Sequence, residues 1–265
     1  MTKIFFFDID NTLLDHRTNR ITESALHAIE TLKQAGHVIA VATGRSHHHA
    51  QEYLDVIKPA YAVLQNGAYI LRENKVLDKT LLAHQPLMRL FADVHARGYY
   101  YGINGVTGGH VSARVDEVMI PMDSVDINVN VDMDFYQNTE ILQGWLFFDE
   151  HLDETLIPQF IVDYPEFDFV RWHQTALDIL PKGVNKLTGC QKVLNDLGFG
   201  MAQAYAFGDG LNDIEMLQGV GTGIAMGNAH PRLKEVADRV TDAIHLDGIA
   251  NMLKVLQEEW QSASV

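Results

Sequence analysis

The sequence predicts an α/β fold in which a doubly wound parallel sheet is interrupted by an inserted α+β segment. Short apolar stretches alternate with segments of helical periodicity, and these stretches lack the polar alternation of a half-exposed strand. The middle of the chain differs, with short strand patterns around glycines. The chain has 265 residues, 47% hydrophobic and 21% charged, which is enough for one large or two modest domains with real cores.

The first apolar stretch, residues 4–7, predicts a buried strand that ends in two carboxylates. Asp8 and Asp10 are one residue apart, and the hydroxyl of Thr12 follows. Open α/β sheets bind ligands beyond the carboxyl ends of their strands, so these acids mark the expected site. Neighbouring buried carboxylates repel, and a divalent cation such as Mg²⁺ would relieve that repulsion. Taken alone, the stretch would also fit a strand followed by an ordinary turn.

The next elements continue the same alternation. Thr22 can cap a helix that precedes a second apolar strand, residues 37–42, and this strand ends in Thr43 and Gly44. Another helix leads to a third apolar strand at residues 61–64. Strand, helix, strand, helix and strand in this order are the start of a doubly wound sheet.

Residues 83–183 predict an inserted domain, because about a hundred residues are enough for an independent core. Their pattern is α+β and includes a hairpin of residues 167–172 and 176–180. The insert would lie over the site, where its closure would exclude water and select the leaving group. The candidate contacts to a bound molecule are Arg114, His110, Trp145, Trp172 and His173, although the two tryptophans also fit a core position.

The doubly wound pattern returns in residues 184–265. Lys186 opens a helix, and a later apolar strand ends just before Asp209, with Asp213 four residues further on. We therefore expect one core domain, made of residues 1–82 together with 184–265. Because the carboxyl ends of parallel strands share one edge of the sheet, these side chains should meet although they are far apart in sequence.

Phosphoryl transfer is the chemistry that this set of residues suits. A carboxylate can attack phosphorus and form an aspartyl-phosphate, and Asp8, which directly ends its strand, is the expected nucleophile. Asp10 would act as general acid and then as base for water. Mg²⁺ held by Asp8, Asp10 and Asp209 would let one anion approach another, with Asp213 as a further ligand or as support.

The positive and hydrogen-bonding groups of the set would bind the transferred phosphoryl group. Lys186 supplies a point charge, and the hydroxyl of Thr43 would act together with nearby backbone N–H groups, such as that of Gly44. Each residue also has an ordinary structural interpretation, as a helix cap, a surface lysine or a turn. Four such coincidences at strand ends are improbable together.

Four ordered motifs carry a resemblance to a known family. They are DIDNTLL at residues 8–14, ATGR at 42–45, KGVNK at 182–186 and GDGLND at 208–213, supported by residues 66–68 and 223–229. At these positions the chain resembles the haloacid dehalogenase (HAD) superfamily, specifically the Cof-type phosphatases with a type IIB cap. The motifs span both predicted core segments.

The resemblance implies a Rossmann-like core, Mg²⁺ dependence, a nucleophilic Asp8 and an Asp10 that contacts the metal through its backbone carbonyl. It also implies phosphate contacts from Thr43, Lys186 and Asn212. Two positions depart from the family pattern, with Asn11 and Leu187 where glycine is common.

The function that we expect is Mg²⁺-dependent hydrolysis of small phosphomonoesters, either sugar phosphates or phosphorylated cofactors. A phosphomutase built on the same core is an alternative, although no sequence feature favours it. A receiver-like signalling module with a phosphorylated aspartate is disfavoured by the length of the chain and by the insertion. Dehalogenation is disfavoured because halide chemistry does not need the carboxylates of Asp209 and Asp213.

The composition of the chain limits the kinds of partner that we expect. With 20 Lys and Arg against 35 Asp and Glu, the net charge is −15, which disfavours nucleic acid and anionic membranes as partners and leaves a small phosphorylated metabolite. Cys190 is the only cysteine, and we expect neither a signal peptide nor a membrane span. We therefore expect a cytoplasmic protein, either a monomer or a homodimer.

Overall fold

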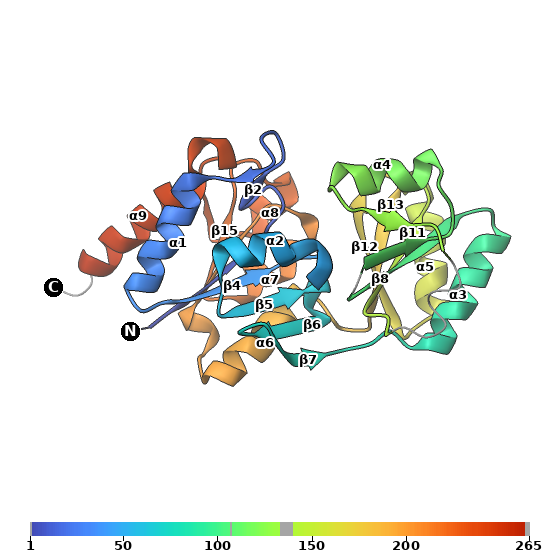
Figure 1. Ribbon diagram of the computed structural model, residues 1–265, viewed down its shortest axis with the longest axis horizontal. Helices are drawn as coiled ribbons and strands as arrows, with labels where there is room; N and C mark the ends of the chain where they lie inside the picture. The colour runs from blue at the N-terminus through green and yellow to red at the C-terminus, as the bar shows by residue number, and fades with distance from the viewer. Residues whose placement is uncertain (1, 107, 133–139, 263–265) are drawn as a thin grey trace.

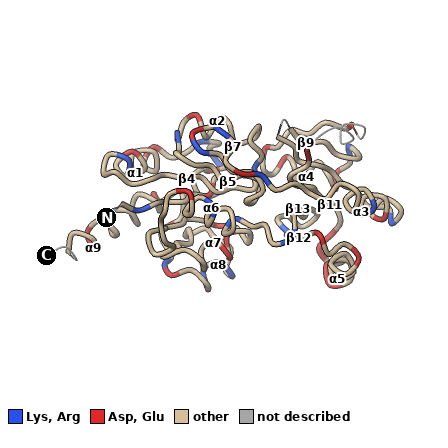
Figure 2. The backbone as a smooth tube through the Cα atoms, turned by 90° about the horizontal axis from the view of Figure 1, so that it is seen from below, with Lys and Arg blue, Asp and Glu red and all other residues tan. Residues whose placement is uncertain are grey.

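The computed structural model describes residues 2–106, 108–132 and 140–262, and it places two sheets in two adjacent lobes (Figure 1). In the described residues, the larger sheet has the strand order β16-β15-β14-β1-β4-β5-β6-β7, and the smaller has the order β10-β9-β8-β11-β13-β12. Figure 2, turned by 90°, shows the same two lobes side by side. The predicted α/β fold with an inserted α+β part is confirmed.

The larger sheet has β1 (Ile4–Phe7) at its centre. This strand pairs in parallel with β4 (Val38–Ala42) on one side and with β14 (Ala204–Gly208) on the other. All four residues of β1 are fully buried, which explains why the strand is apolar without alternation. The remaining strands of this sheet are β5 (Tyr61–Leu64), β6 (Tyr69–Arg72), β7 (Lys75–Lys79), β15 (Thr222–Ala225) and β16 (Arg239–Val240).

Helices cover this sheet, and their caps follow from the sequence. Thr22 caps α1, since its hydroxyl accepts from the backbone N–H of Ala25, and Gly36 follows the helix with a φ of 81°. The described helices of this lobe are α1 (Glu23–Gln34), α2 (His47–Ile57), α6 (Lys186–Leu197), α7 (Ile214–Gly219), α8 (Pro231–Val236) and α9 (Gly248–Ser262).

The smaller lobe is a mixed sheet with helices on both faces. Its strands are β8 (Tyr100–Gly105), β9 (Gly108–Val111), β10 (Val129–Asn130), β11 (Gln143–Phe147), β12 (Phe167–His173) and β13 (Ala176–Pro181). An apolar cluster joins one face to α3 (His84–Ala96) and α5 (Asp153–Asp163), and a second cluster joins the other face to α4 (Asp116–Ser124). The predicted hairpin of β12 and β13 is present.

Two hairpins of the larger lobe were not predicted. Residues 16–19 connect the short antiparallel strands β2 (Leu14–Asp15) and β3 (Arg20–Ile21). The other hairpin joins β6 to β7 through Glu73 and Asn74, which have φ values of 49° and 60°. A two-residue turn with positive φ at both positions matches the twist of a hairpin, so Asn74 was the available signal.

The chain passes from one lobe to the other after β7 and returns before α6. The division into a core of residues 1–82 and 184–265 and an insert of residues 83–183 stays a prediction about domains. In the part of the chain that the structure describes, no helix combines the length and the apolarity needed to cross a membrane.

Candidate active site

Asp8 lies at the end of the central strand and is anchored on both its backbone and its side chain. Its N–H donates to the carbonyl of Phe207 on β14 at 3.0 Å, and its carboxylate Oδ1 accepts from Lys186 Nζ at 2.7 Å. Lys186 is the first residue of α6, where the Asn185 side chain caps the helix. The same ammonium donates to Asp213 Oδ1, also at 2.7 Å. One buried lysine therefore bridges two acids from distant parts of the chain.

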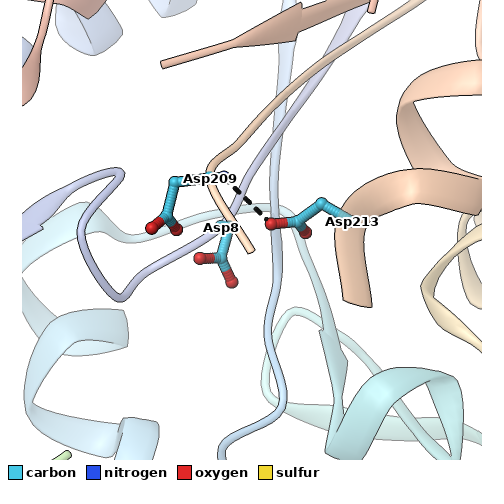
Figure 3. Close-up of side chains that lie close together, drawn as sticks. All are labelled: Asp8, Asp209 and Asp213. Carbon is cyan, nitrogen blue, oxygen red and sulfur yellow. Dashed lines mark hydrogen bonds between the residues drawn. The ribbon is translucent and has the colours of Figure 1, made fainter. Parts of the chain in front are cut away.

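Asp8, Asp209 and Asp213 form a cluster of three carboxylates (Figure 3). One oxygen of each lies within 4.8 Å of the others, and the three side chains point toward a shared space. Burial raises the pKa of Asp8 to about 7, against the lowering effect of Lys186. Burial and the charge of Asp8 likewise raise the pKa of Asp209. The cluster therefore holds more negative charge than Lys186 alone balances.

This arrangement fits a hard divalent cation. Carboxylate oxygens are the ligands that Mg²⁺ prefers, and a cation beside Asp8 and Asp209 would offset the burial that raises the pKa values of both acids. Asp213 is engaged at both oxygens, because Lys186 donates to Oδ1 while the N–H groups of Asp209 and Gly210 donate to Oδ2 at 3.0 Å each. Of the two alternatives left open for Asp213, these contacts favour support of the site.

The side chain of Asp10 lies outside this cluster. Its carboxylate accepts from Arg45 Nη2 at 2.7 Å and from Arg45 Nε at 3.0 Å, and His16 Nε2 lies 2.8 Å from Oδ1. These contacts outweigh the effect of burial and lower the pKa of Asp10 to about 2. The expectation that Asp10 contacts the metal through its backbone carbonyl stays a prediction.

Of the predicted phosphate-binding residues, Lys186 contacts Asp8, and Gly44 and Asn212 line the same pocket as the acids. Thr43 is fully buried, and its hydroxyl accepts from the backbone N–H of Arg45 at 3.1 Å, which shapes the loop after β4. Gly44 lines the pocket, and a Cβ at this position would lie 3.3 Å from the side chain of Asn66. Asn212 also lines the pocket and donates to Asn66 Oδ1 at 2.9 Å.

A pocket of about 550 Å³ opens between the two lobes over Asp8, Asp10 and Asp209. The smaller lobe contributes a polar wall to it. Of the cap contacts expected from the sequence, three line this pocket and two are absent from its described lining. The three are Trp145, Trp172 and His173, and the two are His110 and Arg114. Trp145 is also a core residue, only 1% exposed, while its contact with a bound molecule stays a prediction.

Three residues of the site had no predicted role. Arg45 pairs with Asp10 and also donates to the Val125 carbonyl of the smaller lobe at 2.8 Å, so it contacts both lobes. Asn66, with a φ of 52°, donates to Asp178 Oδ2 at 2.8 Å. Burial raises the pKa of Asp178 to about 7, although hydrogen bonds from Gln143 and Asn66 oppose this.

Partial signals for these residues are present in the sequence. Arg45 and Asn66 lie within the quoted motifs, but their partners come from the other lobe and could not be read from either motif. Asp178 lies between apolar residues in β13, a strand whose six residues are all buried, and a lone acid in such an apolar run was the available sign. The departure at Asn11 is compatible with this backbone, because Asn11 adopts a φ of 53°, a region that glycine and asparagine tolerate best.

Comparison with known families and proteins agrees with this geometry. The family model described as haloacid dehalogenase-like hydrolase matches residues 5–253. The Bacillus subtilis (strain 168) protein YkrA is 36% identical over 258 residues, which cover 96% of this chain and 98% of YkrA. The 5-amino-6-(5-phospho-D-ribitylamino)uracil phosphatase YitU of the same organism is 27% identical, over 93% of this chain and 94% of YitU.

Solved structures give the same result for the fold. The HAD subclass IIB sugar phosphatase BT4131 superposes with a TM-score of 0.84 at 28% identity, over 97% of this chain and 99% of that protein. The match includes both lobes.

Proposed function

Because the chain belongs to the haloacid dehalogenase-like hydrolase family and is a phosphatase of its Cof type, we propose that it hydrolyses small phosphate monoesters with Mg²⁺ through an aspartyl-phosphate on Asp8. The observation that carries the proposal is the position of Asp8. Its carboxylate lines the pocket, anchored by Lys186 and next to Asp209. A nucleophile needs this rigid placement beneath the bound phosphate.

The first step forms a bond between an oxygen of Asp8 and phosphorus and breaks the bond from phosphorus to the ester oxygen. The departing oxygen takes a proton from the carboxyl of Asp10. In the second step, water attacks phosphorus, Asp10 takes its proton, and the carboxylate of Asp8 is released together with inorganic phosphate.

Asp10 is held here in the form that accepts a proton. Arg45 and His16 lower the pKa of Asp10 to about 2, which keeps it ionised. To act as an acid, the carboxyl must first leave these two partners and turn toward the substrate. The contact of Arg45 with Val125 ties this rearrangement to the position of the smaller lobe.

Asp8 and Asp209, with the backbone carbonyl of Asp10, are the residues that would hold Mg²⁺. The cation would neutralise the charge of the nucleophile and of the phosphate oxygens when bound. Lys186 adds a positive charge on the other side of Asp8, and the amide of Asn212 with the backbone of Gly44 would bind phosphate oxygens.

The relatives support a small phosphorylated metabolite as substrate. BT4131 is a sugar phosphatase, and YitU acts on a phosphorylated ribitylamino-uracil. A sugar phosphate or a phosphorylated cofactor would fit a pocket of about 550 Å³, whose size is within the usual range for small ligands.

Phosphate release from a panel of esters tests the proposal. We expect Mg²⁺-dependent hydrolysis by the natural chain and a loss of at least about a thousandfold in Asp8→Asn, because that variant keeps the shape of the side chain but cannot form the intermediate. Asp55→Asn, an exposed position on α2, is the matched control and should retain full activity. Equal rates in Asp8→Asn and the natural chain would refute the proposal, and an isomerised sugar phosphate without free phosphate would indicate a mutase.

A further inference from the structure

We propose that the smaller lobe selects leaving groups that are uncharged and polyhydroxylated, and that Asp178, Asn104 and Gln143 are the residues that recognise their hydroxyls. This inference rests on the proposed phosphatase function, since these residues face the same pocket as Asp8. It narrows the substrate class to phosphates of sugars or sugar alcohols.

The three polar residues are neighbours on one face of the smaller sheet. Gln143 on β11 lies opposite Asn104 on β8, and Trp145 on β11 lies opposite Asp178 on β13. Directly opposed residues of paired strands have their side chains on the same face. All four residues line the pocket, although each is at most 5% exposed. The polar wall is therefore part of the folded core of this lobe.

Asn104 has unused hydrogen-bonding capacity. Its Nδ2 lies 3.4 Å from Gln143 Oε1, but Oδ1 is buried without a hydrogen-bond partner among the described residues. A buried polar atom without a partner is costly, so a position of this kind in a pocket indicates a ligand group that completes it. Oδ1 can only accept a hydrogen bond, which calls for a donor such as a hydroxyl.

The fixed charges of the pocket disfavour a second phosphate, although the imidazoles of His173 and His230 also line the pocket. Two arginines line the pocket, and each is already committed to a carboxylate, Arg45 to Asp10 and Arg171 to Asp153. The described lining contains no lysine, while it includes the carboxylates of Asp178 and Glu150 beside those of the reaction site. A second anionic group on the leaving group would meet repulsion there, whereas a hydroxyl can donate to a carboxylate.

The indole of Trp145 is not available for stacking, whereas Trp172 and His173 also line the pocket and are only partly buried. Ring atoms of Trp145 lie close enough to the backbone that a Cβ on Gly109 would come within 2.8 Å of them, so the indole is packed against β9. Its face is thus covered by the lobe itself. A flat heteroaromatic leaving group gains little from an aromatic ring that is already buried in this way.

A chain of hydrogen bonds connects the wall to the reaction site. Asp178 Oδ2 accepts from Asn66, and Asn66 Oδ1 accepts from Asn212. A leaving group bound to Asp178 is therefore held at a defined position relative to Asn212, the residue that would bind the phosphate. The consequence is a gain in kcat/KM for hydroxylated substrates rather than for all esters.

The experiment compares two substrates with the same carbon chain, sorbitol 6-phosphate and hexyl phosphate, which differ only in their hydroxyls. A site that hydrogen-bonds hydroxyls rejects the analogue that lacks them, so the natural chain should prefer sorbitol 6-phosphate by about 100-fold or more in kcat/KM. In Asp178→Asn this preference should fall at least about tenfold, because kcat/KM should drop much further for sorbitol 6-phosphate than for hexyl phosphate. Asp168→Asn, an ion-paired position on the neighbouring strand β12 with the carboxylate one-third exposed, should leave the preference unchanged.

Asn104→Leu is the second variant, since it keeps the volume of the side chain while removing its polar atoms, and it should also lower the preference. Equal kcat/KM values for the two substrates in the natural chain, or equal losses on both substrates in the two variants, would overturn the inference while leaving the phosphatase proposal intact. Absence of phosphate release from either ester and from p-nitrophenyl phosphate would instead overturn the proposed function itself.

Discussion

Replacing Lys186 by methionine removes the one cation that contacts both Asp8 and Asp213 among the described residues. The ammonium is 1% exposed and lies 2.7 Å from an oxygen of each acid, so the variant leaves two buried carboxylates facing each other. Breaking a buried ion pair in this way costs about 3–5 kcal/mol. Asp213 keeps two backbone donors on its other oxygen, so we expect the lower half of this range.

Urea denaturation of the metal-free protein measures this cost. With a slope of about 3 kcal/mol per molar urea, a loss of about 3–4 kcal/mol moves the midpoint down by about 1 M or slightly more. Lys182→Met is the matched control, because Lys182 lies four residues earlier, is 59% exposed and pairs with a partly exposed Asp168. Surface pairs of this kind contribute about 1 kcal/mol or less.

The pH dependence gives a second check on the same variant. Lys186 opposes the effect of burial on Asp8, so its removal raises the pKa of Asp8 above the present value of about 7. Asp8 is then more readily protonated in the variant. The loss in free energy of unfolding relative to the natural chain should therefore be smaller at pH 6 than at pH 8.5. A midpoint equal to that of Lys182→Met at both pH values would refute the reasoning.

Three further predictions follow from the same contacts. Burial raises the pKa of Asp8 to about 7 from an unfolded value of 3.8, so its contribution to the stability of the metal-free protein is fully present below pH 3.8 and is lost as the pH rises through about 7. Because Mg²⁺ binds the ionised carboxylate, it should bind more tightly at pH 8 than at pH 6 in calorimetric titrations. An affinity that does not change with pH would contradict this. Arg45→Lys removes the two-pronged contact that lowers the pKa of Asp10, so an NMR titration of the metal-free protein should show the pKa of Asp10 raised by about one unit, and an unchanged pKa would show that Arg45 does not set it. Gly189→Ala places a Cβ 2.4 Å from Val63 Cγ1 and should cost about 1–3 kcal/mol in urea denaturation, whereas Gly200→Ala, with no heavy atom within 4 Å of the added Cβ, should change little.

The core could be predicted well because its signals are local. The strand at residues 4–7 is apolar throughout, since both of its faces are covered, and Thr22 and Gly36 show the helix boundaries in the sequence itself. The doubly wound order then brings Asp8 and Asp209 to one sheet edge without further information.

The polar wall could not be predicted, because it depends on pairings between strands of the smaller lobe. Asn104 and Gln143 are 39 residues apart, and only the register of β8 against β11 brings them together. The same is true of Asp178, whose contact with Asn66 spans 112 residues. A sequence pattern gives the face on which a residue lies along its own strand, but not which residue of another strand lies beside it.

The position of the Asp10 side chain was unexpected for a similar reason. The sequence suggested that Asp8, Asp10 and Asp209 share one cation, but Arg45 and His16 draw the Asp10 carboxylate away from the other two. Both partners lie on loops whose conformation depends on the packing around them.

The most direct test of the proposed mechanism is to trap the covalent intermediate in Asp10→Asn. With p-nitrophenyl phosphate the leaving group needs no acid, while the loss of the base at position 10 slows attack by water, so phosphorylated Asp8 should accumulate. The absorbance of the reaction should show a burst of one nitrophenolate per protein. After a rapid quench and borohydride reduction of the acyl phosphate, peptide mass spectrometry should find homoserine at position 8. A burst with an unmodified Asp8, or with phosphate on another residue, would contradict the account.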